Sequence, residues 1–469
     1  MKNVILIITD TFRYDNLGEA SPLGTRTPSL DRFASERATS VTRFFTGSFP
    51  TIPHRTDLAT GRLGWPHYGW QPIGASSANH IGKLLGGAGY ATQLICDCPH
   101  LFRSGFQGGF DAAFQHRGQE GDRFLLHLND AIREVQPHAK TRMKPLFRGS
   151  PLADVHRWLN RYWENEADTF PARTAATAVR WLEENHRAGP FFLWVDFFDP
   201  HEPWDPPEYM VRRYDPAYSG TPMIHPNYGR SDAYTAAELA NLRAHYAAES
   251  ELVDRWIGRV LEKVDDLGLW EESVVVVTSD HGHSVGEHGR TGKSNLCDDD
   301  GRFWPIYPEV GQVPFLVAGG GVRGGRRLDV TAQPIDILPT VVELAGAAIE
   351  PKEPLEGRSF AGALRSGGGE HREFAVSGQF VGVESGPLSE TAPRCVTPFV
   401  VSGRWGYAPV GAAGERELYD LEADPAAETN VAGDHADAAS ELHGMLVEHL
   451  SSHRMGERRL SLWRDLGAG

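Results

Sequence analysis

The sequence predicts an α/β protein in which helices flank a large, mostly parallel central sheet, followed by a small C-terminal α+β subdomain with a short antiparallel sheet. Two observations lead to this fold class. Along most of the chain, apolar strands alternate with segments of helical period, and each strand stops at polar residues. Beyond the glycines 367–369, the pattern changes to short alternating runs and one amphipathic helix.

The chain is long enough for two domains. Its 469 residues exceed one ordinary core, and the glycine-rich stretch at 366–370 is the best linker. We therefore predict a first domain over residues 1–365 and a second over 371–469. Within the first, residues 117–188 are mostly helical in pattern and are interpreted as a helical insertion.

Strands are predicted at residues 3–9, 89–96, 191–198 and 274–277, and the strongest helical period lies at 234–266. In an open parallel sheet the carboxyl ends of the strands share one edge, and ligands bind at that edge. Polar side chains that follow these strands are therefore the first candidates for a functional site.

The composition describes a globular protein, with 40% hydrophobic and 23% charged residues. The formal charge of −16, from 46 basic and 62 acidic residues, argues against nonspecific binding to nucleic acid or to an anionic membrane. An anionic substrate would therefore need a local cationic site. The 20 histidines are informative because imidazole is the commonest metal ligand and titrates near neutral pH.

Nothing in the sequence predicts export or membrane insertion. The apolar run at residues 4–8 is too short for a signal peptide and is followed by no cleavage site. No run reaches the length of a membrane span. The four cysteines form neither a zinc-binding pattern nor a disulfide framework. We therefore predict a cytoplasmic, reduced protein.

Asp10 and the adjacent pair Asp280 and His281 are candidate metal ligands. All three follow apolar strands, and Gly282 lets the backbone come close to a ligand. Carboxylates and imidazole form an oxygen and nitrogen set that suits a divalent ion. The alternatives are a helix cap for Asp10 and a buried structural pair for the other two.

Thr51 is the candidate nucleophile. Pro53 suits the first turn of a helix, so Thr51 would lie at the positive end of the helix dipole. Arg55 would lie on the same turn, and a hydroxyl beside an arginine at a helix N-terminus can hold and attack a tetrahedral oxyanion. The alternative is an ordinary helix start without chemistry.

Three further polar residues follow strand ends. His100 comes after the strand at 89–96 and, taken alone, would be an ordinary surface histidine. His201 lies in a proline-rich loop that would hold its imidazole rigidly, unless the histidine is incidental to that loop. Lys293 lies on the loop beyond Asp280 and could reach an anion as a point charge.

Together these stretches resemble the sulfatase family of the alkaline phosphatase superfamily over essentially the whole chain. Residues 3–18 resemble its opening strand and metal-binding aspartate. Thr51-Ile-Pro-His-Arg and the later Thr-Gly-Arg are similar to its signature, in which Cys or Ser, any residue, Pro, any residue and Arg come first. Further motifs follow in family order: Cys98-Pro-His-Leu, Asp199-Pro-His-Glu-Pro, Thr278-Ser-Asp-His-Gly, Gly286-Glu-His-Gly, Lys293 and Glu417-Leu-Tyr-Asp-Leu.

The resemblance implies an alkaline phosphatase-like fold and an ester hydrolase. It implies one divalent metal ion, Ca²⁺, Mn²⁺ or Zn²⁺, whose ligands would be Asp10, Asp280, His281 and Thr51 itself. It also implies that the anionic ester is surrounded by Arg55, His100, His201 and Lys293. By the same resemblance, His201 or Lys293 would donate a proton to the leaving group.

Two departures from the family pattern shape the functional prediction. Sulfatases convert their Cys or Ser to an aldehyde whose hydrate attacks sulfur, and a threonine, with a methyl on Cβ, cannot form that aldehyde. Threonine is the nucleophile of the related nucleotide pyrophosphatases and phosphodiesterases. Their chemistry implies a second metal, for which Asp199 and His201 are the nearest ligands. In addition, Thr11 and Cys98 replace an aspartate and a lysine that many sulfatases have.

The sequence therefore predicts a metal-dependent hydrolase of a phosphate mono- or diester or a phosphonate ester, with Thr51 as the metal-activated nucleophile. One alternative is a sulfatase that works without formylglycine, and another is a catalytically weak anion-binding protein. The expected partner is a small-molecule anionic ester rather than nucleic acid or a membrane. A second metal and oligomerisation are left open.

Overall fold

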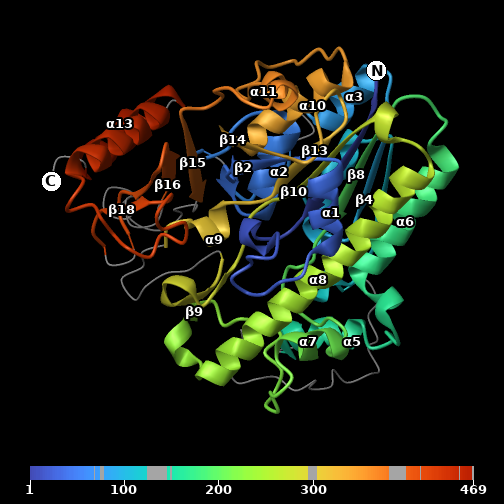
Figure 1. Ribbon diagram of the computed structural model, residues 1–469, viewed down its shortest axis with the longest axis horizontal. Helices are drawn as coiled ribbons and strands as arrows, with labels where there is room; N and C mark the ends of the chain where they lie inside the picture. Colours follow the sequence, from blue (N-terminus) through green and yellow to red (C-terminus); the bar gives the residue numbers. More distant parts are fainter. Residues whose placement is uncertain are drawn as a thin grey trace.

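The computed structural model describes residues 1–67, 69–73, 79–123, 145–147, 150–293, 304–379, 398–411, 414–453 and 455–466 (Figure 1). Its centre is an eight-stranded sheet in the order β14-β2-β13-β10-β1-β8-β4-β5. Strand β13 runs antiparallel to β10 and β2, and the other neighbouring pairs are parallel. The predicted mostly parallel sheet is confirmed.

The strands of this sheet are β1 (Asn3–Thr9), β2 (Thr39–Phe44), β4 (Ala91–Cys96), β5 (Ala112–Gln115), β8 (Phe191–Phe197), β10 (Ser273–Ser279), β13 (Phe315–Ala318) and β14 (Arg326–Ala332). Every residue of β1, β8 and β10 is buried, which explains their continuous apolar sequences. Sequence patterns did not reveal β2 and β14, because both carry charged residues and β14 is an edge strand.

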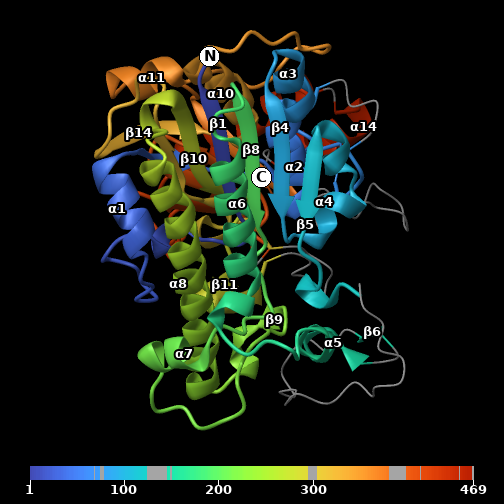
Figure 2. The ribbon, with the colours of Figure 1, turned by 90° about the vertical axis from the view of Figure 1, so that its right-hand side faces the viewer.

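Helices cover both faces of the sheet (Figure 2). On one face, Ile5 and Ile7 pack against α1 (Pro28–Glu36), α6 (Phe170–Asn185) and α8 (Ala236–Asp266). On the other, Val4 and Leu6 belong to a core with α2 (Thr51–Thr60), α3 (Ile81–Gly87), α10 (Ile337–Ala345) and α11 (Ala361–Ser366). Among the described helices, none is both long and apolar enough to cross a membrane.

Part of the predicted insertion, residues 124–144, lies outside the described residues. The described part contains the pair β6 (Pro145–Phe147) and β7 (Ser150–Pro151), then α5 (Leu152–Leu159) and α6. Shorter elements complete this part of the chain: α4 (Pro99–Arg103), α7 (Glu208–Tyr214), α9 (Pro308–Gly311), and the small sheet of β9 (Gly229–Arg230), β11 (Ser284–Val285) and β12 (Arg290–Gly292).

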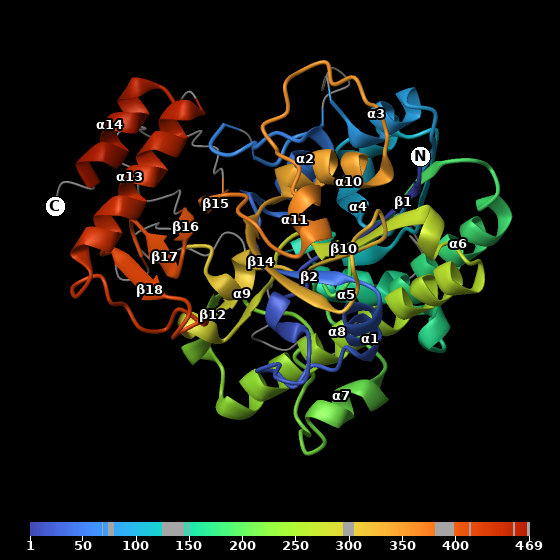
Figure 3. The same ribbon diagram turned by 45° about the horizontal axis from the view of Figure 1, so that its top comes forward.

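The C-terminal sheet is formed by β15 (Phe374–Gln379), β16 (Phe399–Ser402), β17 (Trp405–Ala408) and β18 (Glu417–Asp420), which pair antiparallel. Helices α13 (Ala436–Ser452) and α14 (Glu457–Leu466) lie along its outer side (Figure 3). A fifth strand, β3 (Ser48–Phe49), comes from the N-terminal part of the chain and pairs parallel with β15. No local sequence pattern had predicted β3 or α14.

His288 joins the loop after β11 to the C-terminal part of the chain. Its Nδ1 lies 3.1 Å from Glu309 Oε1, and its Nε2 donates to the carbonyl of Ala427 at 2.9 Å. Burial alone would lower the pKa of His288, but the Glu309 carboxylate and the Ala427 carbonyl raise it from 6.5 to about 9. The imidazolium is therefore stabilised by folding.

We expect this contact to make stability pH-dependent. Because the folded pKa is the higher one, its contribution is complete below pH 6.5 and is lost as the pH rises through about 9. His288→Gln should lower the free energy of unfolding by roughly 1–3 kcal/mol at pH 6 and by less at pH 10. Urea unfolding at both pH values measures the loss of unfolding free energy, and replacement of the exposed His435 by Gln is the control. An equal loss for His288→Gln at pH 6 and pH 10 would contradict the proposed role of the imidazolium.

Candidate active site

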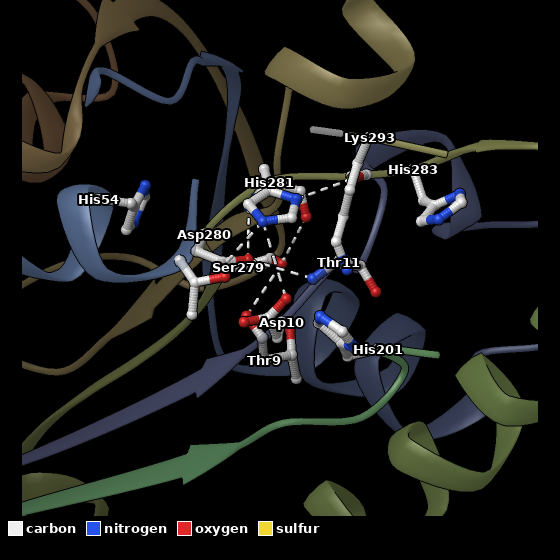
Figure 4. Close-up of polar contacts among 12 residues, drawn as sticks. Thr9, Asp10, Thr11, His54, His201, Ser279, Asp280, His281, His283 and Lys293 are labelled. Carbon is white, nitrogen blue, oxygen red and sulfur yellow. Dashed lines mark hydrogen bonds and ion pairs between the residues drawn. The ribbon is translucent and has the colours of Figure 1, made fainter. Parts of the chain in front are cut away.

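Asp10, Asp280 and His281 converge where β1 and β10 end (Figure 4). His281 Nε2 lies 3.7 Å from Asp10 Oδ1 and 3.6 Å from Asp280 Oδ2, and one donor atom from each residue lies within 4.8 Å of the others. The parallel register of the two strands pairs Thr9 with Ser279, so the residues that follow them meet at one edge of the sheet.

This cluster has the properties of a cation site. All three residues are fully buried, and among the described residues Asp10 Oδ1 and His281 Nε2 have no hydrogen-bond partner. Since His281 Nδ1 donates to the Gly282 carbonyl at 2.8 Å, Nε2 holds the free lone pair. Burial, and then repulsion from Asp280, raises the pKa of Asp10 well above its usual value. A divalent ion would satisfy both unpartnered atoms and offset this repulsion.

Asp280 is fixed more tightly than Asp10. Its Oδ1 accepts hydrogen bonds from the backbone N–H groups of Thr11, at 3.1 Å, and His281, at 2.7 Å. Burial alone would raise the pKa of Asp280, but His281 and Arg55 hold it below the usual range. Thr11 has a φ of 62°, a strained conformation for a β-branched residue, so the turn after β1 is shaped to present its N–H to Asp280.

Arg55 is fully buried among three carboxylates. Its Nε and Nη2 each donate to Asp196 at 2.9 Å, and its Nη1 donates to Asp280 at 2.5 Å and to Asp10 at 3.2 Å. Nη1 also lies 3.3 Å from the carbonyl of Thr51. The guanidinium thus connects the Asp10, Asp280 and His281 cluster to the start of α2, and it contacts carboxylates instead of lining an open space.

Thr51 is the first residue of α2, as its sequence context predicted. Two neighbours connect this helix start to the Asp10, Asp280 and His281 cluster: the Phe49 ring centroid lies 4.7 Å from that of His281, and Arg55 contacts Asp10 and Asp280. Asp57 reaches back from α2 and accepts hydrogen bonds from Ser48 N, Ser48 Oγ and Gly64 N. The β3–α2 turn is therefore held at both ends, with Thr51 98% buried between them.

A second cluster is built around Glu202. Its Oε2 accepts a hydrogen bond from Lys293 Nζ at 2.9 Å and lies 3.5 Å from His283 Nε2, and its Oε1 accepts one from the Tyr228 hydroxyl. Burial alone would raise the pKa of Glu202, but His201, Lys293 and His283 hold it well below its usual value. Lys293 also acts electrostatically on Asp10 and His281, so the two clusters are neighbours (Figure 4).

His201 belongs to this second cluster. Its Nδ1 lies 2.6 Å from the Glu202 carbonyl, so the ring proton is on Nδ1 and Nε2 carries the lone pair. Burial lowers the pKa of His201 to about 3. Its ring stacks on Phe198, with centroids 4.0 Å apart. His201 is therefore neutral in this state and accepts, rather than donates, through Nε2.

Two predicted residues, His100 and Asp199, make their polar contacts outside these clusters. His100 Nε2 lies 2.8 Å from Glu120 Oε2, and its contacts are with that carboxylate and with neighbouring rings. Asp199, the proposed ligand of a second metal, accepts a hydrogen bond from Gln119, and burial together with Asp97 and Asp205 raises its pKa well above the usual value. In the described part of the chain, Asp10, Asp280 and His281 are the one group of three such side chains that could hold an ion.

Sequence reasoning missed three charged partners of the site: Asp196, Glu202 and Glu120. Asp196 had a usable signal, because a carboxylate within the buried strand 191–197 requires a cationic partner. Glu202 stands within the Asp199-Pro-His-Glu-Pro motif but was not assigned a role. Glu120 had no signal, since its loop has no pattern of its own.

The chain is similar to several known proteins along most of its length. The family model described as Sulfatase matches residues 2–347. An arylsulfatase of Clostridium perfringens is 22% identical over 97% of this chain and 95% of its own. The multifunctional alkaline phosphatase superfamily protein PehA of Trinickia caryophylli is 24% identical over 93% of this chain and 92% of its own. Among solved structures, phosphonate monoester hydrolase of Agrobacterium radiobacter matches with a TM-score of 0.73 at 23% identity, over 97% of this chain and 96% of its own.

Proposed function

The chain belongs to the sulfatase family of ester hydrolases, and we propose that it hydrolyses a phosphate or phosphonate ester with Thr51 as the nucleophile. The observation that carries this proposal is the threonine, Thr51, at the first position of the family signature. A threonine cannot become the aldehyde on which sulfatases rely, yet its hydroxyl can attack phosphorus directly. Its position at the start of α2, beside the Asp10, Asp280 and His281 cluster, supports the same choice.

We propose that Asp10, Asp280 and His281 hold a divalent metal ion, with Thr51 as a further ligand. When bound, such an ion would act as a Lewis acid that favours the ionised hydroxyl and offsets charge on the ester oxygens. Thr51 Oγ would then form a bond to phosphorus while the bond from phosphorus to the alcohol oxygen breaks. The product is an alcohol and a phosphoryl or phosphonyl ester of Thr51.

Lys293 is the better proton donor of the two residues expected in that role. His201 is neutral and has its lone pair on Nε2, whereas Lys293 carries a proton that Glu202 orients. Lys293 would protonate the leaving alcohol oxygen. In the second step the neutral amine would accept a proton from the water that hydrolyses the Thr51 ester, which restores Lys293 without a second metal.

Arg55 would act through the carboxylates instead of on the substrate. Its three carboxylate partners are each fully buried, and without a cation they would repel one another. His100 was expected beside the anion as well, but its pairing with Glu120 favours a different role. The substrate's negative charge would therefore be met by Lys293 and the metal ion.

This role for Arg55 gives a stability prediction. Arg55→Ala should lower the free energy of unfolding by about 3–5 kcal/mol, because three buried carboxylates lose their counterion. Urea unfolding measures the change, with exposed Arg32→Ala as the control. A loss below about 1 kcal/mol, the range typical of exposed ion pairs, would instead favour a substrate-facing arginine.

The proposed function is tested by comparing aryl esters. Protein supplied with Mn²⁺, Zn²⁺ or Ca²⁺ should hydrolyse bis(4-nitrophenyl) phosphate or 4-nitrophenyl phenylphosphonate with a higher kcat/KM than 4-nitrophenyl sulfate. A clear preference for the sulfate ester would favour a sulfatase that works without formylglycine. Absence of any ester turnover that depends on Thr51 would favour an anion-binding protein.

A further inference from the structure

We propose that Trp70, His100 and Glu120 form the subsite for the alcohol part of the ester, and that this alcohol carries a ring and a hydrogen-bond donor. The inference rests on the proposed function, since it places the leaving group of that reaction. It also gives His100 a role on the alcohol side of the site instead of beside the anion.

Trp70 supplies an open aromatic surface at this place. Its side chain is 50% exposed, and its ring meets His100 edge-on, with centroids 4.9 Å apart and planes at 86°. Aromatic side chains commonly line small-molecule sites. An indole offers a flat face to an aryl or sugar ring, and such ring contacts add to the area that binding buries.

A chain of ring contacts places Trp70 on the leaving-group side. His100 lies 5.6 Å from the Phe198 ring, and Phe198 stacks on His201 at 4.0 Å. The backbone carbonyl of Glu202 contacts His201, and its side-chain carboxylate contacts Lys293. Because Lys293 protonates the oxygen that leaves, the alcohol must extend on this side of the reacting phosphorus.

Glu120 supplies the polar contact. Its Oε2 is held by His100 Nε2 at 2.8 Å, and in the part of the chain that the structure describes its Oε1 has no hydrogen-bond partner. Its side chain is 23% exposed. Burial alone would raise the pKa of Glu120, but the hydrogen bond from His100 lowers this pKa to about 2. The carboxylate is therefore an acceptor at neutral pH. A hydroxyl or amino group on the alcohol can donate to it.

The backbone at Glu120 is consistent with a functional constraint. Its φ of 49° and ψ of 37° lie in the left-handed region, which costs a non-glycine residue free energy. Gly118 and Gly121 on either side also have positive φ values. The loop therefore holds Glu120 in an unfavourable backbone conformation that places its carboxylate beside His100.

The ring requirement is tested with two phenylphosphonate esters whose alcohols are similarly acidic: phenol, and hexafluoroisopropanol, which has no ring. Trp70→Ala should lower the ratio of kcat/KM for the phenyl ester over the hexafluoroisopropyl ester about tenfold, mainly through KM. The matched control is Tyr209→Ala, which removes an aromatic side chain of similar exposure, 47%, from α7. It should leave that ratio unchanged.

The donor requirement is tested with a second pair, the phenyl and 3-hydroxyphenyl esters. Wild-type protein should prefer the hydroxylated ester, and Glu120→Gln should reduce this preference about fivefold or more while retaining the shape of the side chain. An unchanged preference would overturn the role of Glu120, and an unchanged ratio in Trp70→Ala would overturn the role of Trp70.

A binding experiment separates failure of the subsite from failure of the proposed function. Isothermal titration with 3-hydroxyphenol, the alcohol of the 3-hydroxyphenyl ester, requires no turnover, and Trp70→Ala should weaken its binding about tenfold. If wild-type protein cleaves no ester but still shows this loss, the subsite stands and the proposed reaction fails. If esters are cleaved and neither ratio nor binding changes, the reaction stands and the subsite is refuted.

Discussion

Thr51→Ala is expected to lower kcat for a phosphonate ester by at least about 10³-fold, because the attacking oxygen is removed. The change deletes few atoms from a residue that is 2% exposed, and Asp57 and Arg55 still hold the β3–α2 turn. Steady-state kinetics with saturating metal measure the effect. Circular dichroism and thermal unfolding should be close to wild type.

Thr51→Ser is the matched control, since it keeps a hydroxyl at the start of α2. We expect it to retain activity within about tenfold of wild type on phosphonate esters. If Thr51→Ala kept more than a tenth of the wild-type kcat, the nucleophile would be another group. Loss of activity in the serine variant alone would show that the threonine methyl group positions the hydroxyl.

Asp280→Asn is expected to abolish metal binding and to lower kcat/KM roughly 10²-fold or more. The amide oxygen can still accept hydrogen bonds from the N–H groups of Thr11 and His281, so the local fold should persist. What is lost is one of two negative charges in the cluster. Elemental analysis should find about one divalent ion per wild-type chain and far less in the variant.

The matched control for Asp280→Asn is Asp254→Asn. Asp254 is also buried and also accepts two backbone hydrogen bonds, from Ser29 and Leu30, but it lies on α8 and caps the start of α1 instead of belonging to the Asp10, Asp280 and His281 cluster. The metal content of the Asp254→Asn variant should match that of the wild-type protein. If Asp280→Asn bound the metal as wild type does, or if a chelator left ester turnover unchanged, the assigned ligand set would be wrong.

The residues of the site that follow strands were accessible to sequence reasoning because of one physical rule. Parallel strands bring their carboxyl ends to one edge, so Asp10 and Asp280 had to be neighbours once β1 and β10 were adjacent. Gly282, next to His281, and Pro53, two residues after Thr51, gave further local signals. The continuous apolar sequences of β1, β8 and β10 revealed the sheet for the same reason.

The remaining features depend on contacts between distant segments. Strand β3 has two residues and pairs with β15, more than three hundred residues later in the chain, so no local pattern reveals it. Glu202 and Glu120 are recognisable only through Lys293 and His100, which lie on other loops. The sequence pattern indicated Arg55 as a substrate ligand because its buried partner, Asp196, was not recognised within an apolar strand.

The stereochemical course at phosphorus tests the central claim most directly. A single enantiomer of an aryl phenylphosphonothioate would be hydrolysed in heavy-oxygen water and the configuration of the product determined. Each in-line displacement inverts phosphorus, so attack by Thr51 followed by attack by water predicts net retention. Net inversion would mean that water attacks the ester directly, which would contradict Thr51 as the nucleophile.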